Sequence, residues 1–224
     1  MRHTLFITGT DTGVGKTLLT RLLAVFLRRR GVKVAAFKPL CSGGRADARA
    51  LHATLGGELT LDEINPWHFR APITPLLAAR QEKKSVSLAG VLAHIRARQA
   101  PFEMTLVEGA GGLLSPLGIN FDSRDLICAL RARPVIVAPN RLGVINHVRL
   151  TWGALPTNVR NRAKVVLMSP AKPDAASATN ARLVSSWIPQ GNLFTLPWLG
   201  EEFDAAFVIR IGRVAQTLRA LTDF

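Results

Sequence analysis

The chain has 224 residues, of which 48% are hydrophobic, and a formal net charge of +14 at pH 7. This length suits one folded domain with a sizeable core, and no apolar run approaches the roughly 18 residues that a membrane-spanning helix needs. The two cysteines, Cys41 and Cys128, cannot make a disulfide framework. The N-terminus enters an apolar run without a signal-peptide pattern, so we expect a cytoplasmic protein without a membrane partner.

The excess of Lys and Arg raises the question of a nucleic-acid partner. The basic residues are dispersed along the chain, and their one cluster, Arg28 to Arg30, stands where a helix is expected to end. Cations there interact favourably with the helix dipole. Tyrosine is absent, and aromatic residues do not alternate with basic ones as in an RNA-binding platform. These features argue against a nucleic-acid partner.

Short apolar runs alternate with amphipathic segments along the chain. Strands are predicted at 4–8, 32–37, 104–108, 134–138, 164–168 and 192–196. Helices are predicted at 16–30, 47–55, 76–81, 86–98, 123–131, 142–155, 176–187 and 205–221, with an irregular proline-rich stretch at 65–75. This alternation indicates an α/β fold in one domain spanning 1–224, a doubly wound and mostly parallel sheet with helices on both faces.

Ligands of such folds bind at the carboxyl ends of the strands. Four predicted strands are followed there by glycine or small polar residues, in the segments GTDTGVGKT, KPLCSGGRAD, EGAGG and PNRLGVINH. Because the carboxyl ends of parallel strands lie at one edge of the sheet, we expect these four segments to line one crevice.

The segment FITGTDTGVGKT, near the start of the chain, is similar to the phosphate loop G-x-x-x-x-G-K-[ST], with Thr10 in place of the first glycine. Gly13 and Gly15 allow the backbone to curl with its N–H groups inward. Lys16 offers a charge to phosphate oxygens, and Thr17 offers a hydroxyl to Mg²⁺. An ordinary strand–helix turn rarely needs these residues in this order, so the segment predicts a nucleotide-binding loop at a helix N-terminus.

Charged residues at the other strand ends complete the candidate site. Glu108 can hold Mg²⁺ opposite Thr17, although a surface or capping glutamate is the alternative. Asp47 begins a predicted helix, where it can cap the helix, hold the metal, or do both. Lys38 is either a second cation for phosphate or a solvated lysine. Cys41 lies near the crevice without an obvious base, which argues against a nucleophile.

Taken together, these motifs resemble the dethiobiotin synthetase family. The segments TGTDTGVGKT, KPLCSG, VEGAGG, LGVINH and LPWLGE occur in that family's order and spacing, and NPWHFRAPITP resembles its Asn-Pro aromatic stretch. The resemblance runs from residue 4 to about residue 201. The phosphate loop is shared with related amidases and partition ATPases, and VEGAGG with the amidoligases, whereas KPxxSG together with LGxxNH is more specific.

The resemblance implies a homodimer of P-loop NTPase-like domains that acts on 7,8-diaminopelargonate, CO₂ and ATP with Mg²⁺. One substrate amine takes up CO₂ as a carbamate, which the γ-phosphate activates as a carbamic–phosphoric anhydride. The neighbouring amine then closes the ureido ring and phosphate leaves. The implied activity is that of an ATP-dependent cyclo-ligase of biotin biosynthesis.

The resemblance also implies roles for individual residues. Contacts to the carbamate or γ-phosphate would come from Thr12, Lys16, Lys38 and Ser42. Ligands to Mg²⁺ would be Thr17, Asp47 and Glu108. The nucleotide would be bound by Gly13, Val14, Gly15, Lys16, Thr17, Pro197, Trp198 and Glu201. The substrate would be bound by Lys38 and Ser42, and by Gly143, Val144, Ile145 and Asn146 from the partner subunit.

One departure concerns the nucleotide base. Members of the family that read adenine carry an Asn-Asp pair where this chain has Met168 and Ser169. A methionine cannot both donate and accept hydrogen bonds toward a base edge. We therefore expect weak base selection, with ATP replaceable by another nucleoside triphosphate.

Two other classes of protein are considered beside this one. A partition-type ATPase carries a lysine five residues before the loop lysine, where this chain has Asp11. A cobyrinate-type amidase needs a glutamine-hydrolysing domain, for which we expect no room in 224 residues.

Overall fold

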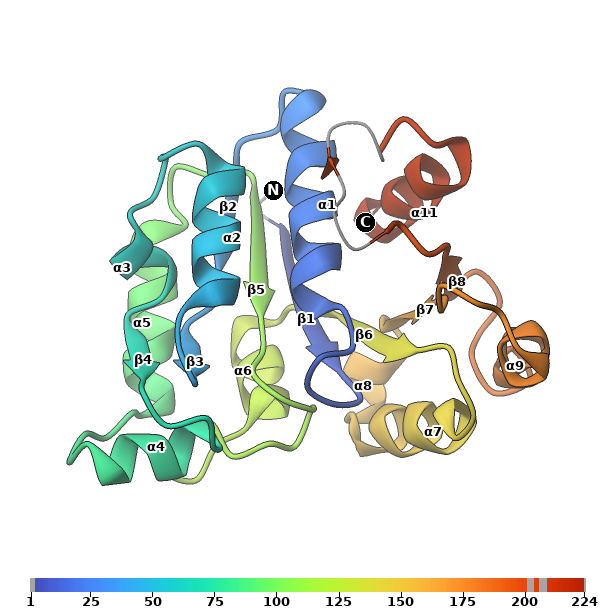
Figure 1. Ribbon diagram of the computed structural model, residues 1–224. Helices are drawn as coiled ribbons and strands as arrows, with labels where there is room; N and C mark the ends of the chain where they lie inside the picture. The colour runs from blue at the N-terminus through green and yellow to red at the C-terminus, as the bar shows by residue number, and fades with distance from the viewer. Residues whose placement is uncertain (1–2, 201–203, 206–208, 224) are drawn as a thin grey trace.

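A six-stranded parallel sheet forms the centre of the fold (Figure 1). The computed structural model describes residues 3–200, 204–205 and 209–223. The strand order is β2-β5-β1-β6-β7-β8. These strands are β1 (His3–Gly9), β2 (Val34–Phe37), β5 (Met104–Glu108), β6 (Arg133–Pro139), β7 (Lys164–Met168) and β8 (Leu193–Leu196). The predicted α/β class is confirmed.

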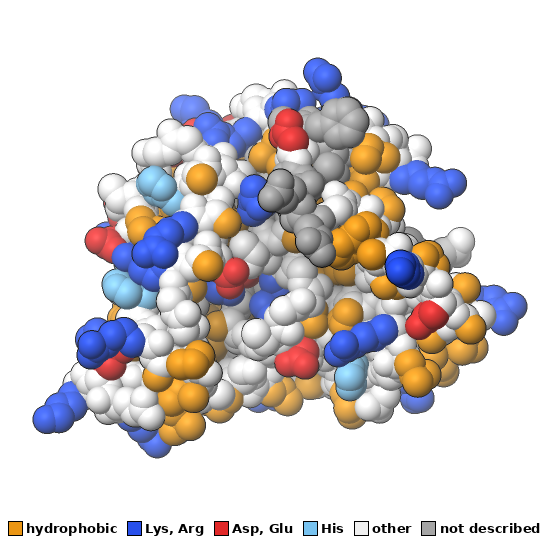
Figure 2. Space-filling model, viewed as in Figure 1, with side chains coloured by type: hydrophobic (Ala, Val, Ile, Leu, Met, Phe, Trp, Pro, Cys, Tyr) orange, Lys and Arg blue, Asp and Glu red, His pale blue; other side chains and the backbone are white. Residues whose placement is uncertain are grey.

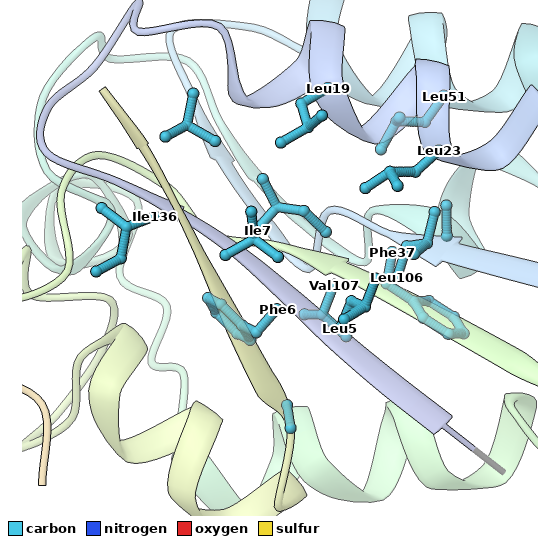
Figure 3. Packing of buried hydrophobic residues seen from close by; sticks show 14 of the residues in the cluster. Leu5, Phe6, Ile7, Leu19, Leu23, Phe37, Leu51, Leu106, Val107 and Ile136 are labelled. Carbon is cyan, nitrogen blue, oxygen red and sulfur yellow. The ribbon is translucent and has the colours of Figure 1, made fainter. Parts of the chain in front are cut away.

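Helices cover both faces of this sheet (Figures 1 and 3). The helices whose bounds the structure describes are α1 (Lys16–Arg29), α2 (Ala46–Leu55), α3 (Leu61–Ile64), α4 (Pro75–Gln81), α5 (Leu88–Arg98), α6 (Ser123–Leu130), α7 (Val144–Ala154), α8 (Thr157–Arg160), α9 (Ala175–Val184) and α11 (Gly212–Thr222). Within the described ranges, none of the helices is long and apolar enough to cross a bilayer.

The core explains why the central strands are continuous apolar runs. Leu5, Phe6 and Ile7 of β1 are all fully buried, because helices cover the sheet on both sides. In Figure 3, Leu19 of α1 and Leu51 of α2 point toward the sheet from one side. Strand β1 is thereby fixed at the centre, and its carboxyl end leads directly into the phosphate loop.

The strand register brings charged residues together at one edge of the sheet. In the β2–β5 pair, Phe37 lies opposite Val107. Lys38 and Glu108 each follow that pair in sequence, so both leave the sheet at the same level. In the β1–β5 pair, Ile7 lies opposite Glu108, which places the phosphate loop beside the same carboxylate.

Several predicted boundaries are corrected. The helix predicted at 205–221 is interrupted: Ala205 is helical, but Ile209 and Arg210 form a turn and α11 begins at Gly212. The helix predicted at 176–187 ends at Val184. The stretch predicted as irregular contains strand β4 (Trp67–Phe69), which pairs in parallel with β3 (Leu40–Ser42) in a second, two-stranded sheet.

Candidate active site

The loop between β1 and α1 has the backbone shape that its glycines predict. Gly13 has φ of +71° and Gly15 has φ of +99°, in the left-handed region that other residues rarely adopt. Gly15 is the N-cap of α1 and no side chain caps this helix. The Thr10 N–H donates to the Val137 carbonyl at 3.0 Å, which anchors the loop to β6. The N-terminus of α1 therefore faces the loop as an anion-binding end.

Lys16 lies inside this loop and is only 6% exposed. Its Nζ donates to the Asp11 carbonyl at 2.7 Å. Burial, together with the nearby Lys38 cation, lowers the pKa of Lys16 to about 8, although the carboxylates of Glu108 and Asp47 act against this. A bound polyphosphate would supply the opposite charge that this buried ammonium group lacks.

Glu108 is the centre of a buried cluster of charges. It is 1% exposed, and its Oε1 accepts hydrogen bonds from Thr17 Oγ1 and from Lys38 Nζ, each at 2.7 Å. Lys38 Nζ also donates to the Gly109 carbonyl at 2.8 Å and lies 3.3 Å from Asp47 Oδ2. Burial acts to lower the pKa of Lys38, but the carboxylates of Glu108 and Asp47 raise it by more, so Lys38 stays charged.

A cavity of about 640 Å³ opens beside this cluster, on the face drawn in Figure 2. Its volume is within the range of small-molecule sites. The predicted site residues that line it are Thr12, Gly13, Gly15, Lys16, Thr17, Lys38, Ser42 and Asp47. Glu108 lies directly behind them, while Val14 is buried and its side chain lies toward Gly9.

The cavity has two further walls, of which one was expected from the sequence. One wall is formed by residues 72–75, which follow β4 and include the first residue of α4, and another by Ala110, Gly111 and Ser115 after β5. Ala110 and Gly111 of the second wall belong to the EGAGG segment, which was expected to line the crevice, whereas Ser115 was not assigned. The first wall is held in place by the β3–β4 pairing, which no local pattern indicates.

The oxygen atoms of the cluster fit a magnesium ion. Glu108 Oε2 is buried and has no hydrogen-bond partner in the described structure. Asp47 does not cap α2, since Arg45 is the N-cap and no side chain caps that helix. Its half-exposed carboxylate faces Lys38 instead. Mg²⁺ usually takes one or two carboxylates, with phosphate and water as its other ligands, and Glu108 and Asp47 supply two carboxylates here.

The segment PNRLGVINH does not line the cavity with the other three predicted segments of the same chain. Gly143 begins α7 with φ of +90°, and Asn146 is exposed. Neither they nor Val144 and Ile145 line the cavity. The expectation of one crevice lined by four segments of the same chain is therefore wrong.

The residues assigned to the nucleotide base also lie apart from the cavity lining. Pro197 is half-buried and Trp198 is 50% exposed. Glu201 lies outside the described residues. The base assignment therefore stays a prediction for all three.

Met168 packs against the phosphate loop. A Cβ placed on Gly15 would lie 3.2 Å from Met168 Cε, so the methionine covers the glycine that begins α1. The backbone around it is engaged: the Asn140 N–H donates to the Met168 carbonyl at 2.8 Å, and the Ser169 N–H donates to Leu196 at 2.9 Å. The end of β7 therefore places the apolar side chain of Met168 beside the phosphate loop.

Two carboxamides near this strand end are engaged with each other. Asn180 Nδ2 donates to Asn140 Oδ1 at 3.0 Å, and Asn140 Nδ2 donates to the Ser177 carbonyl at 2.9 Å. Both asparagines are 4% exposed. Both side chains are therefore engaged with each other and with the backbone beside this strand end.

Cys41 has the character of a packing residue. It is 4% exposed, and burial raises the pKa of its thiol to about 11. Both cysteines are free thiols. The protonated thiol is a poor nucleophile, which agrees with the expectation that Cys41 has no such role.

Comparisons with known proteins agree with this geometry. Residues 3–201 match a family model described as AAA domain. The chain is 40% identical over 199 residues to the ATP-dependent dethiobiotin synthetase BioD of Anaeromyxobacter dehalogenans, covering 87% of this chain and 89% of that protein. It is 44% identical over 155 residues to the protein of the same name from another Anaeromyxobacter species, covering 67% and 70%.

Two solved structures share the fold. The hydrogenase maturation factor HypB of Archaeoglobus fulgidus superposes with a TM-score of 0.53 at 14% identity, covering 98% of this chain and 88% of that one. A ParA family ATPase of Chlorobium tepidum gives a TM-score of 0.54 at 12% identity, covering 97% and 96%. At such identities the likeness shows the fold alone.

Proposed function

This chain belongs to the dethiobiotin synthetase family, and we propose that it converts 7,8-diaminopelargonate and CO₂ to dethiobiotin with hydrolysis of ATP. The observation that carries the proposal is the arrangement of Lys16, Lys38, Thr17 and Glu108 around one cavity. A partition-type ATPase would share this fold, but Asp11 stands where such an ATPase carries its lysine.

The reaction requires two anions, a carbamate and a triphosphate, to meet in one cavity. Lys16, Lys38 and the N–H groups of the phosphate loop would offset their repulsion. A carbamate oxygen then attacks the γ-phosphorus and ADP leaves. The second amine attacks the activated carbon and phosphate leaves. Because both groups belong to one molecule, the site mainly has to position them. Hydroxyls of Thr12 and Ser42 line the same cavity and would orient the carbamate.

Magnesium would be held by Thr17, Asp47 and Glu108. Its support is the unpaired Oε2 of Glu108 and the position of Asp47 beside Lys38. When bound, the ion would neutralise charge on the β- and γ-phosphates. Lys38, which contacts both carboxylates, would hold them in place while presenting its own charge to the cavity.

The experiment that tests the proposed function is phosphate release measured with and without 7,8-diaminopelargonate. We expect release to depend on this diamine and on CO₂, with dethiobiotin formed in equal amount. Phosphate release that ignores the diamine would overturn the proposal and favour a nucleotide-switched ATPase.

A homodimer with shared sites is part of the proposal. Leu142 is 84% exposed and Leu150 is 65% exposed on the two sides of Gly143 to Asn146. In the proposed homodimer, the partner subunit would cover these two side chains. The N-terminus of α7 in one chain would then receive the substrate carboxylate bound in the other, with Asn146 supplying its side-chain amide.

Hybrid dimers test this shared site. Lys16→Ala and Asn146→Ala chains are each expected to be nearly inactive, because each site of a homodimeric variant lacks one group. Mixing them should restore activity, since one of the two sites in a hybrid has both groups intact. Lys16→Ala chains mixed with themselves are the control. Absent recovery, after subunit exchange is verified by mass spectrometry, would contradict a shared site.

Base selectivity gives a further prediction. With Met168 beside the loop and Pro197 and Trp198 as the assigned base contacts, the base would be held by apolar packing, which discriminates poorly. We expect GTP, CTP and UTP to replace ATP within about tenfold in kcat/KM, or roughly 1.4 kcal/mol. The measurement is dethiobiotin formation with each nucleotide at fixed Mg²⁺. A preference for ATP of about a hundredfold would contradict the prediction.

A cytoplasmic location and the lack of membrane and nucleic-acid partners stay predictions from the sequence. On the face drawn in Figure 2, Lys and Arg side chains are scattered among other side chains rather than gathered in one patch.

A further inference from the structure

A buried side chain outside the cavity connects Lys38, which lines the cavity, with Arg45, which does not. Asn65 follows α3 and is fully buried. Its Nδ2 donates to the Lys38 carbonyl at 2.7 Å, and its Oδ1 accepts from Arg45 Nε at 3.0 Å. Buried amide groups are costly unless they are hydrogen-bonded. Asn65 therefore holds the backbone of Lys38 and the side chain of Arg45 in a fixed relation.

Arg45 is anchored to the same segment by the rest of its guanidinium group. Nη2 donates to the carbonyls of Leu61 at 2.8 Å and Asn65 at 2.9 Å, and Nη1 lies 2.8 Å from Asp62 Oδ1. The side chain is only 14% exposed. A planar guanidinium group with several fixed partners defines the orientation of its side chain better than the flexible ammonium group of a lysine does.

Arg45 stands at the start of α2, so its contacts fix where this helix begins. Arg45 is the N-cap of α2, and Asp47 lies two residues later in the first turn. Gly43 and Gly44 precede it with φ of +77° and +112°. Glycines leave a segment with the most backbone freedom to lose. The N–H groups of Gly43 and Gly44 donate to the Phe69 carbonyl at 3.1 and 3.4 Å, so this loop has its own tie to β4. The Arg45 anchor adds the fixed contacts at the N-cap of α2 itself.

Lys38 is fixed by the same segment from the other side. The Lys38 N–H donates to the Ile64 carbonyl at 3.0 Å, and the Lys38 carbonyl accepts from Asn65 Nδ2. Both partners of the 3.3 Å contact between Lys38 Nζ and Asp47 Oδ2 are thus positioned from residues 61–65.

We propose that Arg45, seated on Asn65, is a positioning residue that holds Asp47 beside Lys38 at the metal and phosphate end of the cavity. The inference rests on the proposed function, in which Asp47 helps to hold Mg²⁺. A misplacement of about 1 Å at a reacting centre can reduce the rate by about a hundredfold. The guanidinium group does not touch the reactants and acts through the helix start that it fixes.

Nucleotide binding tests the role without turnover. Arg45→Met keeps an unbranched apolar side chain of similar length and removes the guanidinium group. We expect it to weaken binding of a non-hydrolysable ATP analogue at least fivefold in the presence of Mg²⁺, and by less than twofold in EDTA. Asp62→Asn is the matched control, because it removes the exposed partner of the same guanidinium group and leaves its contacts to Leu61 and Asn65. That variant should bind like the wild type.

Kinetics in two backgrounds separate positioning from general support of the fold. Arg45→Met should lower kcat/KM about tenfold and raise the Mg²⁺ concentration for half-maximal rate. In the Asp47→Ala background, Arg45→Met should change kcat/KM by less than twofold, since the residue it acts through is gone. If Arg45→Met does not fold, Arg45→Lys replaces it, with losses in the same direction.

Two outcomes would overturn the inference: equal weakening of analogue binding with Mg²⁺ and with EDTA, or an unchanged kinetic effect of Arg45→Met in the Asp47→Ala background. Either one would make Arg45 a residue of general stability. The binding measurement needs no diamine, so it stands even if the wild type forms no dethiobiotin, and failure of the proposed function is recognised separately.

Discussion

Lys16→Ala is expected to lower ATP-dependent turnover about a thousandfold, leaving almost no activity, and to leave the fold intact. Lys16 Nζ lies in the phosphate loop at the wall of the cavity, 2.7 Å from the Asp11 carbonyl. Its charge would act on phosphate oxygens in a site that is largely shielded from water. Loss of one such preorganised group lowers the rate by about 10²–10³, or about 2.7–4 kcal/mol. Because the loop also needs this charge to bind the triphosphate, we expect the loss to lie at the upper end.

The fold should tolerate this change because the hydrogen bond of Lys16 Nζ stays within its own loop. Circular dichroism and the melting temperature are therefore expected to match the wild type within a few degrees. Lys84→Ala removes an exposed lysine that contacts Glu82, and serves as the control with normal turnover. Near-normal turnover of Lys16→Ala would contradict the phosphate-loop assignment.

The central sheet could be predicted because each strand carries its own signal. Leu5 to Ile7 and Val135 to Ala138 are fully buried runs, and such runs are visible in any single sequence. Strands β3 and β4 were missed because each has three residues and exists through pairing with the other. The short helix α3 was missed as well, although its capping box, Thr60 with Glu63, is a local signal that could have revealed it.

The candidate site was predictable where its chemistry is concentrated in short segments. The phosphate loop places glycines, a lysine and a threonine within a few residues, and its geometry follows from them. Lys38 and Glu108 could be found because polar residues that end buried strands meet at one sheet edge. The contacts from Arg45 to Asn65 could not, because they join residues about twenty positions apart through an unpatterned segment.

Glu108→Gln is expected to lower turnover by at least a hundredfold, with partial recovery at high Mg²⁺. The substitution keeps the shape of the side chain and an oxygen that can accept from Thr17 and Lys38, which both donate to Oε1. It removes the negative charge that Mg²⁺ favours in its ligands. Higher Mg²⁺ would compensate for weaker metal binding but not for the changed charge and position of the ion beside the phosphates, so recovery should stay incomplete.

The same substitution should also destabilise the protein, because it leaves the buried ammonium group of Lys38 with Asp47 as its carboxylate partner. Breaking a buried ion pair from one side costs about 3–5 kcal/mol. Adding Lys38→Met should return much of this stability without returning activity, which separates the two roles of Glu108. Glu58→Gln, at a surface ion pair with Arg28, is the control and should change neither quantity. If Glu108→Gln keeps both its turnover and its Mg²⁺ dependence, the carboxylate serves the fold alone and the metal assignment is wrong.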